Sequence, residues 1–288
     1  MKPSTISRIC VATIQGWWAD RAMSMGASLA FYTVFSLAPI LLMAIAVAGF
    51  FFGNDEARQA VVRETSELVG DSAAAAIDSL LATGGKFGSG LLGTIVGVLT
   101  FLISATAAFI ELQDDLNIIL KAQPPKYASY LLFLRQRFIS FAMIVAIGFL
   151  LLVSLTLDAA LTAARSYFNL GAVGVIISIV NVALSLGMSV TLFVLIFKIL
   201  PNVQLPWKNA IAGAVVTGIM FVVGKFLIGF YLGRTEVASN FGAAASIITI
   251  LLWIYYSSQI LLLGAEFVKA SISVGNSRAS ERASANVA

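Results

Sequence analysis

The stretch "IITILLWIYY", residues 247–256, shows no alternation of apolar and polar positions. Transmembrane strands alternate in this way, whereas a transmembrane helix needs about 20 consecutive apolar residues to cross a hydrocarbon layer about 30 Å thick. The stretch lies inside a charge-free run, residues 241–265, which is long enough for such a helix. The run therefore predicts a membrane-spanning helix.

The rest of the chain has the same character. Of its 288 residues, 59% are hydrophobic and only 11% are charged, whereas soluble domains carry about 25% charged residues. The sequence therefore predicts an all-α membrane protein with six transmembrane helices. Runs with few or no charges place these helices at residues 22–52, 91–110, 138–157, 170–197, 210–232 and 241–265.

Three further segments complete the prediction, in which residues 1–270 form a single domain. The N-terminal segment, residues 4–23, has apolar residues at helical spacing and two adjacent tryptophans, which favours a helix lying in the lipid headgroup layer. Residues 53–89 predict two short amphipathic helices on the outer side. These helices form either a lid packed on the bundle or a gate or docking surface for an envelope partner. The polar residues 271–288 predict a disordered tail.

The basic residues predict the orientation, since cytoplasmic loops carry an excess of lysine and arginine. With both termini in the cytoplasm, the 18 basic residues divide into twelve inside, five outside and one, Lys225, within a span. This asymmetry predicts that both termini lie in the cytoplasm. It also accounts for the net charge of +4 without any binding of nucleic acid.

The residue types that are missing argue against catalysis. The chain has no histidine and a single cysteine, Cys10, which excludes histidine-activated nucleophiles and metal sites built from histidine or cysteine. It has no GxxxxGK[ST] phosphate loop, and no GxGxxG stretch that opens a helix after a strand. We therefore expect no enzyme activity, no metal and no cofactor.

Five stretches of the sequence, taken in order, resemble one family of bacterial membrane proteins. They are "ASLAFYTVFSLAPILLM" (27–43), "ATAAFIELQDDLN" (105–117), "LPNVQLPWKNAIAGA" (200–214), "GKFLIGFYLG" (224–233) and "GAAASIITILLWIYYSSQILLLGAEF" (242–267). Together they resemble the YihY/virulence factor BrkB family. The resemblance implies a multi-pass protein of the bacterial inner membrane, and a role in moving lipids or lipid-linked molecules has been inferred for parts of the family. Some members are labelled ribonuclease BN, which this chain does not support because a zinc-dependent RNA hydrolase needs histidine ligands.

Polar residues within the predicted spans are the candidates for a substrate pathway. Lys225 lies about 12 Å from the outer end of its helix. Its ammonium either reaches the outer headgroups or meets an anionic group in an internal cavity. Asn181 lies at a similar depth and is the candidate neighbour of Lys225. Pro39 predicts a kink or an opening in the first span, with Tyr32 and Ser36 on the turns before it.

Charged residues gather at the predicted cytoplasmic mouth. Glu111 and Asp115 are four residues apart on one helical face, and Glu266 lies at a similar depth on the last span. We predict that Glu111 or Glu266 pairs with Arg135 or Arg137 and thereby closes the cytoplasmic side.

The sequence leaves two functions open. The first is transport of an amphipathic and anionic envelope molecule, with the bilayer and a lipid-like substrate as partners. The second is a scaffold or envelope-assembly factor that transports nothing and uses the external segment. A groove open sideways to the lipid would favour transport, whereas a solidly packed bundle would favour the scaffold.

Overall fold

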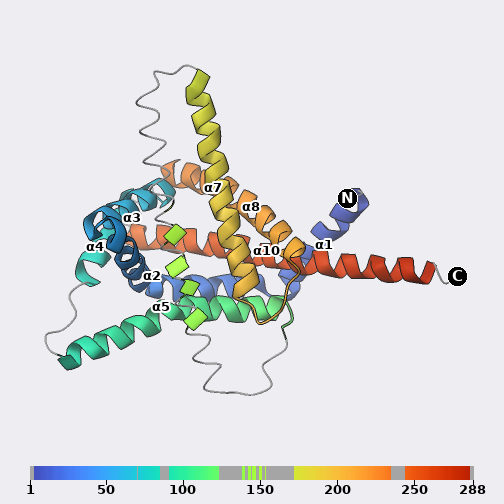
Figure 1. Ribbon diagram of the computed structural model, residues 1–288, viewed down its shortest axis with the longest axis horizontal. Coiled ribbons are helices and arrows are strands. Elements are labelled where there is room, and N and C mark those ends of the chain that lie inside the picture. The colour runs from blue at the N-terminus through green and yellow to red at the C-terminus, as the bar shows by residue number, and fades with distance from the viewer. Residues whose placement is uncertain are drawn as a thin grey trace.

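The computed structural model is almost entirely helical in the residues that it describes (Figure 1). These residues are 3–69, 71–84, 91–122, nine positions between 138 and 153, 172–234 and 244–285. No strand occurs within these ranges. The helices are α1 (Pro3–Ala19), α2 (Ala22–Phe52), α3 (Asn54–Val69), α4 (Asp71–Gly84), α5 (Leu91–Ile119), α7 (Ala172–Ile199), α8 (Trp207–Arg234) and α10 (Ala244–Ala285).

Three of these helices contain apolar stretches long enough to cross a membrane. They are Val182–Ile199 in α7, Trp207–Gly224 in α8 and Ile247–Gly275 in α10. Helix α2 coincides with the first predicted span, whereas α5 begins with the second predicted span at Leu91 and continues beyond its predicted end to Ile119. Most of the span predicted at 138–157 lies outside the described residues, so the arrangement of six spans stays a prediction.

Large apolar side chains on these helices face outward. Val223 and Leu227 of α8 and Ile247 of α10 are all exposed. A water-soluble protein rarely exposes extended apolar surface of this kind, whereas lipid tails are as apolar as these side chains. The outward apolar surface is therefore explained by contact with the bilayer.

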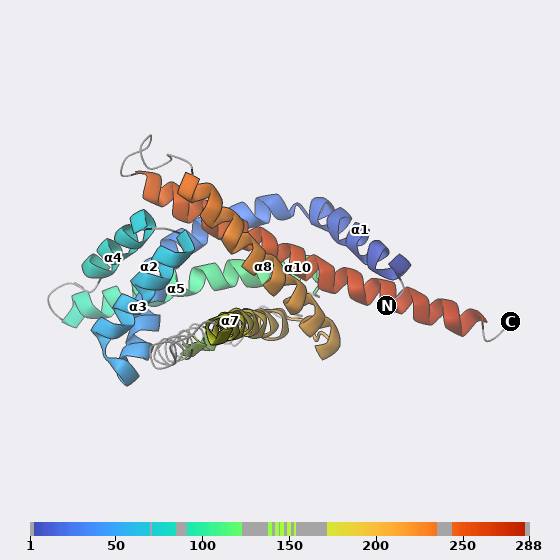
Figure 2. The ribbon, with the colours of Figure 1, turned by 90° about the horizontal axis from the view of Figure 1, so that it is seen from above.

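Helix α10 is the axis of the molecule (Figures 1 and 2). Its 42 residues extend over roughly 63 Å at about 1.5 Å per residue, which is about twice the thickness of the hydrocarbon layer. Helices α1, α2, α5 and α8 pack along it. The main hydrophobic core forms where α5, α7 and α8 meet α10, and its fully buried members include Leu116, Phe197 and Leu262.

A glycine allows the closest approach of α8 to α10. A Cβ atom at Gly264 would overlap Oγ1 of Thr217 on α8 and would lie 3.1 Å from Cζ of Phe197 on α7. Small residues at such crossings let two helices come close enough for extensive van der Waals contact. The sequence also contains GxxxG steps at residues 93–97 and 229–233, whose surroundings lie outside the described residues.

The predicted external helices are present as α3 and α4, at the end of the molecule away from the C-terminus (Figure 1). The chain breaks before α3 at Gly53, whose φ of 102° favours glycine. Val61 and Ile77 are buried against Ile250 of α10 in a second hydrophobic core. The two helices therefore pack on the bundle, and their role as a lid, a gate or a docking surface stays a prediction.

The two ends of the chain also pair with each other. Helix α1 lies along the C-terminal half of α10 (Figure 2), where Ile9 packs on Ala270 and Val274. The opposite side of α1 remains apolar and exposed, with Trp18 at 72% exposure. This exposed face is compatible with the predicted position in the headgroup layer, which stays a prediction.

Residues 271–285 of the predicted disordered tail belong to helix α10 in the structure, and the disorder of the tail stays a prediction. Helix α10 continues through Ala285. The tail contains four alanines and two arginines, and both residue types are strong helix formers. A helix that continues from an existing helix also needs no new nucleation, which is the costly step in helix formation.

Helix α2 is continuous through Pro39. The sequence predicted a kink or an opening there, since proline cannot donate to the carbonyl one turn earlier. The helical assignment runs without a break from Ala22 to Phe52. The predicted opening is therefore not present, and Pro39 is accommodated within a continuous helix, as occurs in other membrane helices.

Candidate functional site

A cluster of three charged side chains lies at the end of the bundle where α1 packs on α10. Glu266 of α10 is 1% exposed and forms an ion pair with Lys269 at 2.9 Å. The Lys269 ammonium also binds the carboxylate of Asp20, at 2.5 Å. Buried charges are costly unless they are paired, so these contacts explain how the cluster persists within an apolar helix. We call Asp20, Glu266 and Lys269 the charge cluster.

The junction between α1 and α2 brings Asp20 into this cluster. The chain turns at Arg21, whose φ of 56° lies in the left-handed region. Burial by itself raises the pKa of Asp20. Hydrogen bonds with Lys269 and Glu266 and the charges of Lys269 and Lys121 act in the opposite direction, and the pKa of Asp20 is lowered overall. Asp20 is therefore held as a carboxylate at neutral pH.

Two glycines let the N-terminal helices approach α10 closely. A Cβ atom at Gly16 would overlap Oε2 of Glu266, and one at Gly26 would overlap Nε2 of Gln259. Gln259 joins the two helices: Trp17 donates from Nε1 to its Oε1 (3.1 Å), and its Nε2 donates to the first carbonyl of α2 (3.2 Å). The α1–α2 junction is thus hydrogen-bonded to α10 through Gln259, two turns before Glu266.

A pocket of about 240 Å³ opens beside the charge cluster. Small-molecule sites in proteins usually enclose about 300–1,000 Å³, so this pocket suits a polar head group better than a whole lipid. Its lining combines small, hydroxyl-bearing and charged side chains. The lining residues are Ala12, Lys121, Glu266, Lys269, Ala270 and Ser273.

Polar side chains near the end of α5 hold the loop between α7 and α8. Gln113 is buried and donates to the carbonyl of Leu200 (2.6 Å). The side-chain oxygen of Asn117 accepts from the backbone N–H of Asn202 (2.7 Å). These bonds satisfy backbone groups where α7 ends, which must be paired when they are removed from water.

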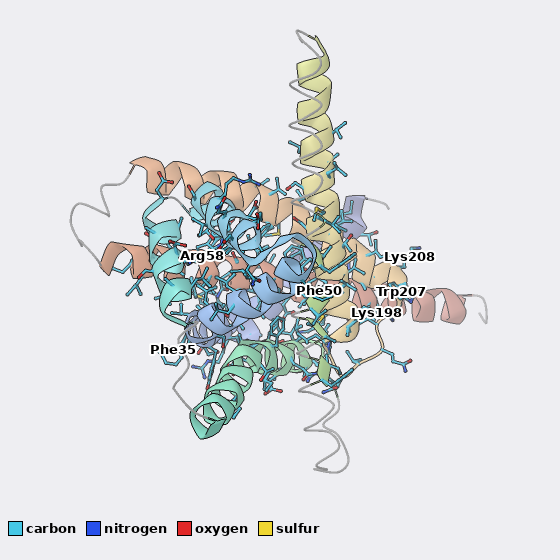
Figure 3. The ribbon with its side chains drawn as sticks, turned by 60° about the vertical axis from the view of Figure 1, so that its left-hand side comes forward. Phe35, Phe50, Arg58, Lys198, Trp207 and Lys208 are labelled. Atoms are coloured by element: carbon cyan, nitrogen blue, oxygen red, sulfur yellow. The ribbon has the colours of Figure 1, made fainter. Side chains whose placement is uncertain are left out.

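A lysine at the end of α7 and a tryptophan at the start of α8 contact each other across the same loop. Figure 3 shows Lys198, Trp207 and Lys208 near one another. Lys198 donates to the carbonyl of Leu205 and lies 5.0 Å from the centroid of the Trp207 ring. Asn209, two residues after Trp207 in α8, donates from its side-chain amide to Ser271 Oγ of α10 (2.8 Å). The start of α8 is therefore tied both to the end of α7 and to α10.

Asp115 is a buried carboxyl group on α5, beyond the apolar stretch that ends at Ile110. Burial, with smaller contributions from the negative charges of Glu111 and Asp114, raises its pKa to about 7. Its Oδ2 atom has no hydrogen-bond partner among the described residues. An acid with a raised pKa in the folded state destabilises that state as it ionises, so stability falls as the pH rises from about 4 to about 7.

We expect Asp115→Asn to remove this loss. The variant should differ least from the wild type at pH 4 and unfold at a higher temperature at pH 8, because it has no carboxylate to ionise. Thermal unfolding of the purified protein at both pH values measures the effect, with Glu56→Gln, at an exposed carboxylate on α3, as the control. Lower stability of Asp115→Asn at pH 8 would show that a cation, such as the predicted Arg135 or Arg137, pairs with the carboxylate.

The residues predicted to form a substrate pathway are only partly described. Tyr32 is exposed and contacts the Phe31 ring edge-on, with 5.9 Å between the ring centroids, whereas Ser36 is buried. The side chains of Pro39, Asn181 and Lys225 lie outside the described residues. Their role in a pathway therefore stays a prediction.

The predicted cytoplasmic mouth has a different set of observed contacts. Glu266 and Asp115 are buried, and Glu111 is partly buried. The ion-pair partner observed for Glu266 is Lys269. Arg135 and Arg137 lie outside the described residues, so their pairing with Glu111 or Glu266 stays a prediction.

Asp20, Gln259 and Lys269 were not predicted from the sequence to be site residues. Lys269 could have been found, since it lies three residues after Glu266 on the same helix, where side chains are neighbours. Asp20 and Gln259 gave no comparable signal, because their partners lie more than 200 residues away along the chain.

Comparison with known proteins assigns the family. The family model described as Virulence factor BrkB matches residues 13–287, and this range includes every member of the charge cluster and every residue that lines the pocket but Ala12. The chain belongs to the BrkB family. Curated relatives of this BrkB-family chain are named UPF0761 membrane proteins, so it is a membrane protein.

One such relative, from Methylibium petroleiphilum, is 28% identical over 85% of this chain and 58% of its own length. Another, from Rhodospirillum centenum, is 25% identical over 87% of this chain and 54% of its own length. The BrkB-family chain thus spans little more than half the length of these relatives. No solved structure matches it.

Proposed function

We propose that the protein moves an anionic, amphipathic, lipid-like molecule across the cytoplasmic membrane, with both of its termini in the cytoplasm. The observation that carries the proposal is the charge cluster beside the pocket. Glu266 and Lys269 lie within the apolar stretch Ile247–Gly275 of α10. Charged residues within membrane spans are costly and commonly mark the pathway of a substrate or an ion.

The dimensions and surroundings of the pocket support a lipid-like substrate. Its volume of about 240 Å³ suits a head group, and the helices around it expose apolar side chains that can lie along acyl chains. A molecule with one polar end and one apolar end could therefore pass with its head in the protein and its tail in the lipid. No breaking of covalent bonds is needed for such a movement.

A scaffold that transports nothing is the second candidate. It is favoured by the α3–α4 hairpin, which packs firmly on α10 and is braced by an ion pair between Arg58 and Asp78 (2.7 Å). A rigid external hairpin could serve as a docking surface for an envelope partner. Family membership supports both candidates equally, since the family description gives no molecular activity.

Exchange of lipid between leaflets separates the two candidates. We expect purified full-length protein in vesicles to speed the exchange of fluorescent phosphatidylglycerol by at least about tenfold over protein-free vesicles, which is a barrier about 1.4 kcal/mol lower. Reductive quenching of the outer leaflet measures the rate. Vesicles with heat-unfolded protein are the control, and labelling of the exposed Cys10 with an impermeant maleimide reports the orientation. Exchange no faster than in the control would exclude transport of this lipid and favour the scaffold.

A further inference from the structure

The turn between α7 and α8 carries positive charge that its own helices do not balance. Lys198 lies in the last turn of α7 and Lys208 in the first turn of α8, and Figure 3 shows both near Trp207. The sequence contains no acidic residue between Asp158 and Glu236. None of the ion pairs formed by the described residues includes either lysine. The two positive charges of the turn therefore have no carboxylate on α7 or α8 to neutralise them.

The acids of the neighbouring helix α5 leave this charge in place. Gln113 and Asn117 of α5 hold the turn by hydrogen bonds, and three acids share that part of the helix. Burial and then the charge of Glu111 raise the pKa of Asp114. The pKa of Asp115 is raised by burial, Glu111 and Asp114. A lysine close to either carboxyl would lower its pKa, and no described lysine acts on either one.

The turn lies at a boundary of the membrane. The apolar stretch of α7 ends at Ile199, and that of α8 begins at Trp207. The side-chain amide of Asn209 donates to Ser271 Oγ of α10 (2.8 Å), close to Gly275, where the apolar stretch of α10 ends. Three apolar stretches thus reach their limits at one level, as expected where the hydrocarbon layer gives way to the headgroups. The lysines of the turn therefore lie at headgroup depth.

One of the two ammonium groups is already held in position. Lys198 is partly buried, donates to the carbonyl of Leu205 and lies 5.0 Å from the centroid of the Trp207 ring. An ammonium has three N–H donors, so these contacts leave it able to donate to a phosphate oxygen. A side chain that is held before binding loses less freedom when it binds. Trp207 is 61% exposed, and tryptophan is enriched at membrane–water interfaces.

We infer that the surface formed by Lys198, Trp207 and Lys208 binds the phosphate group of an anionic phospholipid in the adjacent leaflet. Both ammonium groups contact the phosphate as compact point charges, and the tryptophan ring packs along the glycerol and the upper acyl chain. A zwitterionic lipid binds less tightly, because the two lysines repel its own ammonium. The inference goes beyond the proposed function, since a protein that transports nothing would bind lipid on this surface in the same way.

Lys208→Gln tests the inference with little risk to the fold, because this side chain is exposed. The affinity for phosphatidylglycerol should fall about fivefold, which corresponds to about 1 kcal/mol for one lysine near an anionic membrane surface. The preference over phosphatidylethanolamine should shrink to the same extent. Lys208→Arg keeps the charge and should bind as the wild type does. Native mass spectrometry of the full chain titrated with each lipid measures the affinities.

A matched control separates the site from the overall charge of the protein. Arg63→Gln removes one positive charge at an exposed position of α3 and should bind both lipids as the wild type does. An equal loss of phosphatidylglycerol binding in Arg63→Gln and Lys208→Gln would show a general effect of net charge and would overturn the inference.

Tryptophan fluorescence locates the bound lipid. The chain has four tryptophans, so the quenching that is lost in Trp207→Phe isolates the contribution of Trp207. Phosphatidylglycerol brominated in its upper acyl chain should quench Trp207 more strongly than brominated phosphatidylethanolamine does. This difference should disappear in a variant that combines Lys198→Gln with Lys208→Gln.

The remaining outcomes decide against the inference or leave it standing. Equal binding of the two lipids by the wild type would overturn it, as would an undiminished preference in the variant that lacks both lysines. Displacement of phosphatidylglycerol by equimolar glycerophosphoglycerol would also overturn it, because the site would then recognise a soluble ester. Lipid exchange between leaflets is measured separately, so the failure of this inference and the failure of the proposed function are distinguishable.

Discussion

Lys269→Met is expected to lower the free energy of unfolding by about 3–5 kcal/mol, the range seen when one partner of a buried ion pair is removed. Lys269 neutralises both Asp20 and Glu266, and Glu266 is 1% exposed. Methionine preserves the length and the apolar stem but leaves two carboxylates facing each other. Unfolding in mixed micelles measures the loss.

Two further measurements separate the loss of charge from the loss of packing. Stability of Lys269→Met should recover in part as the pH falls from 7.5 to 5, because the unpaired carboxylates then take up protons. Replacing Asp20 by Asn and Glu266 by Gln in the same variant should restore stability at pH 7.5. Lys208→Met, at an exposed lysine, is the control and should change stability by no more than about 0.5 kcal/mol. A loss in Lys269→Met no larger than in this control would show that the cluster has no structural role.

Gly264→Leu is expected to have the second-largest effect, a loss of about 3 kcal/mol, at the upper end of the usual range for overpacked cores. A Cβ at Gly264 already overlaps Oγ1 of Thr217. The larger side chain must push α8 away from α10 at the centre of the main core. Unfolding in mixed micelles again measures the effect.

A second glycine of the same helix supplies the matched control. A Cβ at Gly275 would meet no atom within 4 Å, so Gly275→Leu should raise stability by up to about 1 kcal/mol through helix propensity alone. Thr217→Ala combined with Gly264→Ala should recover part of the loss of Gly264→Ala, since it removes the overlapped atom. Equal effects of leucine at positions 264 and 275 would contradict the close contact of α8 with α10.

Of the two carboxylates in the charge cluster, Glu266 could be predicted from the sequence and Asp20 could not. Glu266 was identified from sequence because a carboxylate at the end of a long apolar run is conspicuous. Its companion Asp20 lies in a polar junction like many others. Only the left-handed turn at Arg21 and the close contact at Gly16 bring that carboxylate to α10. Periodicity relates residues on one helix and carries no information about which helices cross.

Lys121 shows the same limit at the level of the backbone. A lysine before "AQPP" is an ordinary residue in a sequence, and its left-handed conformation follows from how α5 ends against its neighbours. The contacts of the α7–α8 loop could not be predicted from the sequence either. The buried Gln113, which donates to the carbonyl of Leu200, lies 87 residues earlier in the chain. Hydrogen bonds over such separations depend on the packed bundle.

The sequence by itself determined that this chain is a helical membrane protein and where the apolar helices of its described part lie, because apolar runs of this length have to satisfy their backbone groups within one segment. The first span was predicted at residues 22–52, and α2 occupies Ala22–Phe52. Tertiary structure alone decided the seating of α3 and α4 on the bundle and the position of Asp20 beside Lys269. These features depend on side-chain contacts between segments that are far apart in the sequence. The energies of such contacts depend on how well the side chains fit and on their removal from water, and a local pattern of residues encodes neither property.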